Sequence, residues 1–196
     1  IYVGIDPGLT NLGLSVVEDC SPGEGRIRDR FKNLHSEVFS VASYPSMERA
    51  CDDVLLKVFS AMPGSSSEAR VFGITIERYV PYDGKMTQVA EEINILIGML
   101  RMAFHKYFEG KVEVGMVRAF DWKVALSQLL AKEGIPNPST SLDKKFSYDA
   151  ATSLCGVRPP TTHEADALCI ASLPAISRSV RTSHVKKEDI PPQGPT

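Results

Sequence analysis

The chain has 196 residues, of which 43% are hydrophobic and 23% are charged. This composition suits one soluble globular domain followed by a tail, and it excludes a globally disordered chain. No apolar run approaches the roughly 20 residues that a membrane-spanning helix needs, so we expect no membrane association. The formal net charge of −2 argues against a uniformly basic nucleic-acid binder, although local basic patches can lie beside clustered carboxylates.

The cysteine pattern bears on metal binding and on the cellular compartment. The four cysteines form no C-x-x-C pair, which disfavours a zinc site. Their spacing does not suggest a disulfide scaffold, so we expect reduced thiols. No basic and apolar signal segment opens the sequence. Together these features predict an intracellular rather than a secreted protein.

The N-terminal third predicts an antiparallel start. Apolar side chains alternate over residues 1–6, which is typical of a strand. Pro7-Gly8 is a turn signal, and a second strand is expected over residues 12–17. A loop rich in Gly, Pro and charge follows at 21–30, and a third strand is expected over 37–42.

The middle of the chain alternates helix and strand. Ser46 is expected to cap a helix whose apolar residues recur at helical spacing, and which ends at residues 63–67. Residues 71–77 are apolar on both faces, which predicts a central buried strand. A long helix over 87–108 and a fifth strand over 112–118 follow.

The C-terminal part is expected to be helical up to its tail. Asp121 is a candidate cap for a helix that runs through Lys132 and is closed by Gly134. After a Pro- and Ser-rich loop over residues 135–142, a short helix is expected over 146–154.

Thr161 and Glu164 form a predicted capping box for a last helix over residues 162–173. From residue 177 the sequence turns basic and then Pro- and Gly-rich, which predicts a mobile tail over 177–196 after a domain over 1–176.

This element order predicts an α/β fold. A meander of three strands followed by alternating helices and strands gives a five-stranded mixed sheet flanked by helices. That is the ribonuclease H-like arrangement.

Four side chains are candidates for one metal site. Asp6 and Glu77 end the first and fourth strands, which we expect to lie side by side and parallel. His163 and Asp166 are three residues apart and share a face of the last helix. Close carboxylates repel one another unless a cation lies between them, and magnesium prefers oxygen ligands. Two such ions can catalyse phosphodiester hydrolysis.

Each of these residues also has a plain structural interpretation. Asp6 precedes Pro-Gly and could simply form a turn. Glu77 could pair with Arg78 at the surface. His163 could complement the dipole of its helix. The combination is more informative than any single member.

With these residues the sequence resembles the RuvC-like Holliday junction resolvases of the ribonuclease H-like superfamily. The resemblance covers residues 1–173 and rests on Gly4-Ile5-Asp6-Pro7-Gly8-Leu9, Thr75-Ile76-Glu77-Arg78 and His163-Glu164-Ala165-Asp166-Ala167-Leu168. The loops over 21–30 and 135–142 look longer than is usual in the family, which is as compatible with a viral, phage or organellar member as with a cellular one.

The resemblance implies an endodeoxyribonuclease that cuts four-way or branched DNA by paired symmetric nicks and leaves 5′-phosphate ends. It implies two Mg²⁺ ions, replaceable by Mn²⁺, held by Asp6, Glu77, His163 and Asp166. It also implies lysines near the scissile phosphate, which match Lys123 and the catalytic candidate Lys145. Such an enzyme acts wherever DNA is replicated or recombined.

The remaining candidates concern DNA binding and assembly. The family carries an aromatic wedge three residues after the glutamate, where this chain has Val80 beside Tyr79 and Tyr82. These tyrosines, with Arg78, Lys85, Lys123 and Lys144, are the predicted DNA-binding residues. The resemblance also implies a homodimer through the helix over residues 87–108, which is apolar on two sides. Its first apolar stripe is Val89, Ile93, Leu96, Ile97, Leu100 and Phe104, and its second is Ile95, Met99 and Met102. The alternative for that helix is complete burial in the core.

Other functions stay open at this point. A ribonuclease acting on RNA or hybrids would use the same residues. Asp6-x-Gly8-x-Thr10 resembles the phosphate loop of actin-like and sugar-kinase modules, but the second Gly-rich loop of those folds is missing from the sequence. A non-catalytic DNA-binding scaffold would not need the full set of Asp, Glu, His and Asp.

Overall fold

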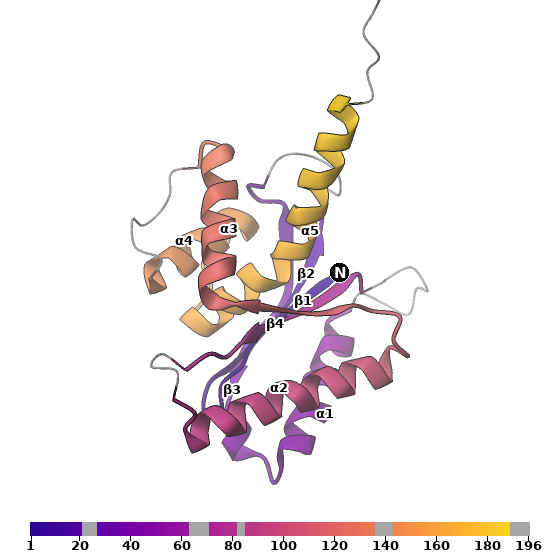
Figure 1. The fold of residues 1–196 in the computed structure, drawn as a ribbon, viewed down its shortest axis with the longest axis vertical. Coiled ribbons are helices and arrows are strands. Elements are labelled where there is room, and N and C mark those ends of the chain that lie inside the picture. Colours follow the sequence, from indigo (N-terminus) through magenta and orange to yellow (C-terminus); the bar gives the residue numbers. More distant parts are fainter. Residues whose placement is uncertain (21–26, 63–70, 82–84, 136–142, 189–196) are drawn as a thin grey trace, which may run out of the picture.

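The computed structural model describes residues 1–20, 27–62, 71–81, 85–135 and 143–188, with residues 178–188 described by their backbone alone. At its centre is a mixed five-stranded sheet with the order β3-β2-β1-β4-β5 (Figure 1). The strands are β1 (Tyr2–Asp6), β2 (Leu12–Asp19), β3 (Phe31–Phe39), β4 (Gly73–Arg78) and β5 (Val114–Arg118). The predicted α/β fold class is confirmed.

The strand pairing brings two candidate site residues together. β1 pairs antiparallel with β2 and parallel with β4, and β4 pairs parallel with β5. Ile5 lies opposite Ile76 in the β1–β4 register. Asp6 and Glu77, one residue further along, therefore leave adjacent strands at the same edge of the sheet, as the sequence predicted.

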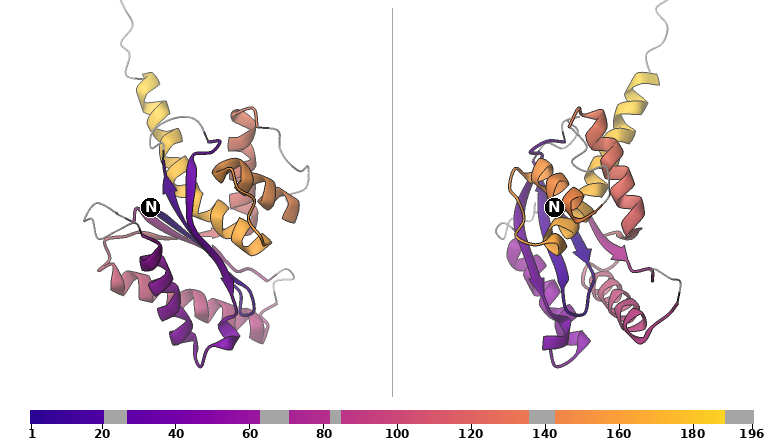
Figure 2. Two further views of the ribbon diagram at one scale, coloured as in Figure 1. Left: turned by 180° about the vertical axis from the view of Figure 1, so that it is seen from behind. Right: turned by 90° about the vertical axis from the view of Figure 1, so that its left-hand side faces the viewer.

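Helices cover both faces of the sheet. They are α1 (Met47–Ala61), α2 (Gln88–Tyr107), α3 (Ala119–Lys132), α4 (Lys144–Cys155) and α5 (Thr162–Glu188), with a short 3₁₀ helix η1 (Val41–Ser43) before α1. α1 and α2 lie on one side, and α3, α4 and α5 lie on the other (Figures 1 and 2). Within the described part of the chain, no helix is long and apolar enough to cross a membrane.

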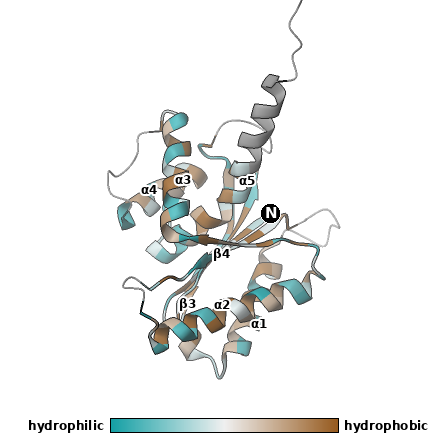
Figure 3. Ribbon diagram, in the orientation of Figure 1, coloured by the Kyte–Doolittle hydropathy of each residue, from teal (hydrophilic) through white to brown (hydrophobic). Residues whose placement is uncertain are grey.

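Two hydrophobic cores hold these layers together. Alternate strand residues such as Val3 and Ile5 pack with Leu96 and Leu100 of α2. The opposite face packs against α3, α4 and α5 through a second cluster that includes Trp122. Figure 3 shows both hydrophobic and hydrophilic turns on α2, as expected for a helix that buries only part of its circumference.

Glycines in β1 and β2 allow α5 to lie directly on the sheet. A Cβ atom on Gly4 would come within 2.0 Å of the Ala167 carbonyl oxygen, and one on Gly13 within 2.3 Å of the His163 carbonyl oxygen. Neither site could accept a side chain without a shift of the backbone of α5. These close contacts set the height of the first turns of α5 above the ends of β1 and β2.

The start of α5 is as predicted, but its end is not. The Thr161 hydroxyl accepts a hydrogen bond from the Glu164 backbone N–H (3.2 Å), and Glu164 accepts one from the Thr161 backbone N–H (3.0 Å), which completes the capping box. The helix continues to Glu188 rather than ending at residue 173, although Pro174 lies inside it. Ala175 and Ile176 are buried, so packing continues beyond the proline. Residues 177–188 of the expected tail are thus helical, and the assignment of a separate tail stays a prediction.

Other boundaries also differ from the expected ones. β3 begins at Phe31, earlier than the expected residue 37. α3 begins at Ala119, and Asp121 does not cap it, because its carboxylate accepts hydrogen bonds from Arg118 at 2.6 and 3.0 Å. α4 is capped by Asp143 and ends at Gly156, whose φ of 71° lies in the left-handed region.

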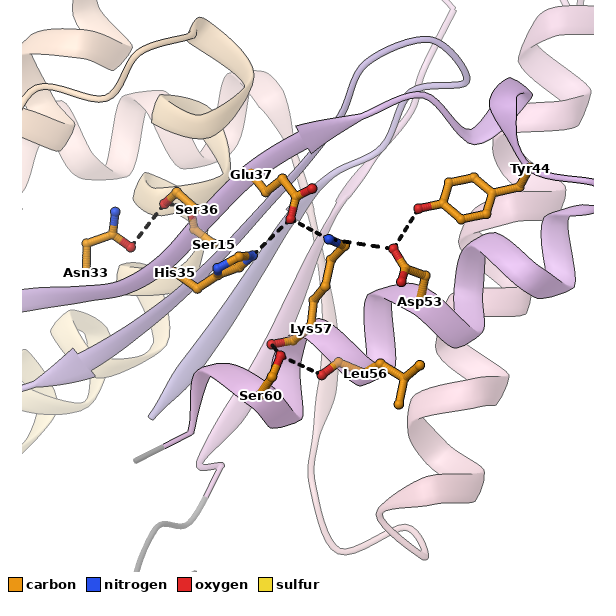
Figure 4. A network of polar contacts seen from close by, with 10 residues as sticks. All are labelled: Ser15, Asn33, His35, Ser36, Glu37, Tyr44, Asp53, Leu56, Lys57 and Ser60. Carbon is orange, nitrogen blue, oxygen red and sulfur yellow. Dashed lines mark hydrogen bonds and ion pairs between the residues drawn. The ribbon is translucent and has the colours of Figure 1, made fainter. Parts of the chain in front are cut away.

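A polar network fastens α1 to the outer strand β3 (Figure 4). Lys57 Nζ donates to Glu37 at 2.6 Å and lies 3.7 Å from Asp53. The Tyr44 hydroxyl donates to Asp53 at 2.6 Å, and His35 Nε2 lies 3.3 Å from Glu37. Opposite charges therefore alternate along this contact.

Candidate active site

Asp6 and His163 meet over the end of the hairpin. Asp6 lies opposite Gly13 in the β1–β2 register, and the His163 backbone lies directly above Gly13. His163 Nδ1 consequently lies 2.7 Å from Asp6 Oδ2. The hydrogen bond to Asp6 raises the pKa of His163, because the nearby carboxylate favours the protonated ring. The Asp6 side chain is 12% exposed and that of His163 40%.

Glu77 is held by a residue from another element. Its Oε2 accepts a 2.7 Å hydrogen bond from the indole N–H of Trp122, in the first turn of α3. Burial, together with the charge of Asp6, raises the pKa of Glu77 to about 7, while the Trp122 hydrogen bond acts in the opposite direction. The carboxyl group of Glu77 therefore releases its proton at a higher pH than an ordinary glutamate does.

Asp166 lies one turn after His163 on α5 and points into the same region. Its Oδ1 is buried and has no hydrogen-bond partner among the described residues. Lys123 Nζ is the nearby cation, 4.0 Å away. Burial raises the pKa of Asp166, and Lys123 opposes that effect. The buried Ser147 hydroxyl is close enough to lower this pKa too, although Ser147 Oγ also lacks a partner in normal hydrogen-bond geometry among those residues.

The four predicted side chains therefore form one electrostatically coupled group. Asp6 raises the pKa of both Glu77 and Asp166, and Asp166 raises that of His163. Repulsion between carboxylates is what a bound divalent cation relieves. As the described side chains are placed, no three His, Cys, Asp or Glu residues form a group that could hold a metal ion. The ligand assignment stays a prediction.

The basic candidates divide into near and distant ones. Lys123 contacts Asp166, and Lys144, at the start of α4, is close enough to His163 to lower its pKa. Lys145 is exposed in the same turn, where its backbone N–H donates to Asp143. No contact among the described residues joins the Lys145 side chain to Asp6, Glu77, His163 or Asp166.

The candidates after β4 are less clustered. Arg78 and Lys85 are exposed, and Val80 is 55% exposed. Tyr79 is partly buried against the core that contains α1 and α2. Tyr82 lies outside the described residues.

Sequence reasoning missed two residues of this region, Trp122 and Ser147. Trp122 contacts Glu77, which lies 45 positions earlier in the sequence. No local sequence pattern predicts a contact between residues so far apart along the chain. Its place beside the candidate Lys123 was the only available signal. Ser147 looked like an ordinary helix residue, although it is completely buried near Asp166.

The exposed face of α2 is relevant to assembly. Ile93, Leu96, Ile97, Leu100 and Phe104 are buried, as predicted. Val89 was assigned to that stripe but is 54% exposed, because it lies near the start of the helix. Ile95 and Met102 are 56% and 74% exposed. The alternative of a completely buried helix is therefore wrong for this chain.

Comparison with known proteins finds similar folds but no similar sequences. No family model matches the chain, and no curated protein matches it significantly. It is similar to Thermus thermophilus RuvC in complex with a Holliday junction substrate, with a TM-score of 0.60, 21% identity, and coverage of 92% of this chain and 94% of that chain. A second Thermus thermophilus RuvC structure gives a TM-score of 0.62 and 23% identity over 93% and 95% of the two chains.

The yeast mitochondrial Holliday junction resolvase Ydc2 is also similar. Its TM-score is 0.52 at 14% identity, over 96% of this chain and 83% of that chain. At these identities the likenesses establish the ribonuclease H-like fold of the resolvases, and the fold alone.

Proposed function

We propose that this protein is a metal-dependent endonuclease of the RuvC-like family, which resolves Holliday junctions or other branched DNA by paired symmetric nicks. The observation that carries the proposal is the meeting of Asp6, Glu77, His163 and Asp166 at one edge of the sheet. Because one fold hosts many activities, the proposal depends on these side chains, and the similarity to solved resolvases supports it.

The chemistry of the site fits divalent cations. Three carboxylates are suitable ligands for Mg²⁺ or Mn²⁺, and the His163 imidazole adds one nitrogen ligand. Asp166 Oδ1 is buried without a hydrogen-bond partner among the described residues, so this oxygen is available to bind a cation. Asp6, Glu77, His163 and Asp166 would hold two such ions. Bound there, the ions would supply an activated water and stabilise the leaving oxygen.

The chain's own residues would perform the remaining work. Lys123, 4.0 Å from Asp166, can contact a nonbridging phosphate oxygen and stabilise the charge that develops on it. Asp6 orients His163 through Nδ1, which can hold the proton of that hydrogen bond while Nε2 binds a cation. Lys145, exposed at the start of α4, is the proposed second lysine at the scissile phosphate. Cleavage would leave a 5′-phosphate.

A basic surface beside these residues would bind the DNA backbone. Arg78, Lys85, Lys144 and Lys145 are exposed on segments that begin or end near the site edge. Each phosphate contact releases counterions, so junction affinity should fall linearly with salt on a logarithmic plot, with a slope near −0.9 per contact. Replacing Lys144 and Lys145 with alanine should reduce that slope. Tyr79 and Tyr82 are proposed to contact bases.

A homodimer through α2 would bring two sites to one junction. Exposed Ile95 and Met102 flank Gly98, where an added Cβ would meet no atom within 4 Å. The N-terminal half of α2 carries Glu91 and Glu92, whereas its C-terminal half carries cationic residues. Antiparallel pairing with a second copy would therefore match acidic with basic turns about a two-fold axis.

The decisive experiment is incubation with a labelled four-way junction and Mg²⁺, beside a linear duplex and an RNA–DNA hybrid. Symmetric nicks with religatable 5′-phosphate ends are expected only on the junction. Efficient cutting of the hybrid without junction preference would indicate a ribonuclease. Tight junction binding without cutting, in Mg²⁺ and in Mn²⁺, would indicate a non-catalytic scaffold.

A further inference from the structure

Trp122 occupies an unusual position between the core and the candidate site. It is the single tryptophan of the chain and is completely buried in the first turn of α3. Its ring centroid lies 6.4 Å from that of Phe146 in the core on the α3–α5 side. A purely apolar ring at this core position would carry no hydrogen-bond donor. Only a polar edge could also reach a carboxylate.

That polar edge is directed at Glu77. The indole N–H donates to Glu77 Oε2 at 2.7 Å. Glu77 Oε1 accepts no hydrogen bond from the described residues. Hydrogen bonds to a charged acceptor are short and strong, and the indole N–H cannot lose its proton in the physiological range. One carboxylate oxygen is thus fixed while the other stays available.

The face of the same ring contacts the other half of the site. Lys123 Nζ lies 5.1 Å from the centroid of the Trp122 ring, within the range of a cation–π contact. The same ammonium group lies 4.0 Å from Asp166 Oδ1. Through its edge and its face, Trp122 therefore links Glu77 on β4 to the lysine that neighbours Asp166 on α5.

We propose that Trp122 is a positioning residue, whose indole N–H holds Glu77 Oε2 so that Oε1 is presented to a divalent cation. The inference rests on the metal-dependent function proposed above. Groups that orient metal ligands in this way typically change metal affinity or activity 10–100-fold when they are removed.

The first test measures metal affinity without DNA. Trp122→Phe keeps an aromatic ring but removes the donor, and Phe146→Leu is the matched control, because it disturbs the same core without touching Glu77. Free Mn²⁺ is quantified by electron paramagnetic resonance. We expect the dissociation constant to rise about tenfold in Trp122→Phe and less than twofold in Phe146→Leu. Equal effects in the two variants, or a wild type that binds no Mn²⁺, would overturn the inference.

The second test uses the single indole resonance as a spectroscopic signature. In ¹⁵N-labelled protein this resonance should move when Glu77 is replaced with glutamine and should shift saturably with Mg²⁺. A resonance that neither change moves would contradict the proposed role. Neither readout involves DNA. Failure to cut junctions would therefore refute only the proposed activity. The role of Trp122 would still be decided by the Mn²⁺ affinity and by the indole resonance.

Discussion

The β3–α1 contact and the candidate active site both place charged side chains against the central sheet, but their charges are balanced differently. In the first, Lys57 lies between Glu37 and Asp53, and its pKa is raised chiefly by the hydrogen bond to Glu37 (Figure 4). In the second, burial and the neighbouring charge of Asp6 displace the pKa of Glu77 upward. Opposite charges favour the ionised form, whereas crowded carboxylates disfavour it.

This difference separates a structural network from a site that is prepared for a ligand. The network needs no added ion, since each of its carboxylates already has Lys57 as a cationic neighbour, and His35 also lies beside Glu37. The site has one nearby lysine, Lys123, and one histidine for three carboxylates. Like charges held together at some cost to stability are typical of functional sites. Substitutions in the two regions should therefore have opposite consequences for activity and stability.

The largest expected effect is on cutting by Asp166→Asn. Loss of a metal-ligand charge should reduce the nicking rate more than about 100-fold. Removal of a residue that only orients a metal ligand already costs up to about that factor. Junction affinity in a gel-shift assay should stay within about threefold. The matched variant Asp53→Asn, in the β3–α1 network, should cut at the wild-type rate. Parallel loss of binding and cutting in Asp166→Asn would assign the residue to the fold.

Gly13→Ala should damage the site through the backbone. The new methyl group would overlap the His163 carbonyl, which lies 2.3 Å from the Cβ position, and α5 would have to move away from β2. We expect unfolding free energy to fall by about 3 kcal/mol, the upper end for overpacking, together with loss of cutting. Gly115→Ala in β5 is the control, since its Cβ meets no atom closer than 3.9 Å and a glycine-to-alanine change within a strand gains about 0.5–1 kcal/mol. Chemical denaturation measures both.

The pH dependence of stability should reveal the crowded carboxylates. The pKa of Glu77 rises from its ordinary 4.5 to about 7, so the folded state binds the proton more tightly than the unfolded chain. The contribution of Glu77 to the unfolding free energy should accordingly be greatest below pH 4.5 and fall by up to roughly 3 kcal/mol as the pH rises through 7.

Glu77→Gln should remove that fall and be more stable than the wild type at pH 8. A smaller fall from His163 and Asp166 should remain, because the pKa of each is raised in the folded state and that stabilisation is also lost with rising pH. Thermal unfolding from pH 4 to 8, without metal ions, gives both profiles. Superimposable curves for the variant and the wild type would contradict the interpretation.

Prediction from sequence succeeded where the signal was local or where pairing followed from element order. The apolar runs ending in Asp6 and Glu77, with parallel pairing of their strands, were enough to bring these two residues to one sheet edge. The capping box at Thr161 located the start of α5 and with it His163. These are patterns within a few residues, or consequences of a single strand pairing.

The failures have a common physical cause, which is tertiary packing. The early part of β3 is half exposed and alternates weakly, so its pairing with β2 rather than its composition defines it. α5 continues past Pro174 because Ile176 is buried. Trp122 reaches Glu77 only because α3 packs against the sheet end.

The smallest expected effect belongs to the β3–α1 network. Tyr44→Phe removes the 2.6 Å hydrogen bond to Asp53 and should lower the unfolding free energy by about 1 kcal/mol, because a hydrogen bond to a charged group at a partly exposed site contributes little more. Asp53 keeps Lys57 as a neighbour at 3.7 Å, so the network should loosen without losing its charge balance. Burial and Asp53 raise the pKa of Tyr44 to about 12, so the loss should be constant from pH 6 to 9. The rate of junction cutting should be unchanged. A cutting defect in Tyr44→Phe would mean that the β3–α1 network and the candidate active site are coupled through the sheet. The difference in charge balance between them would then not separate a structural region from a functional one in this protein.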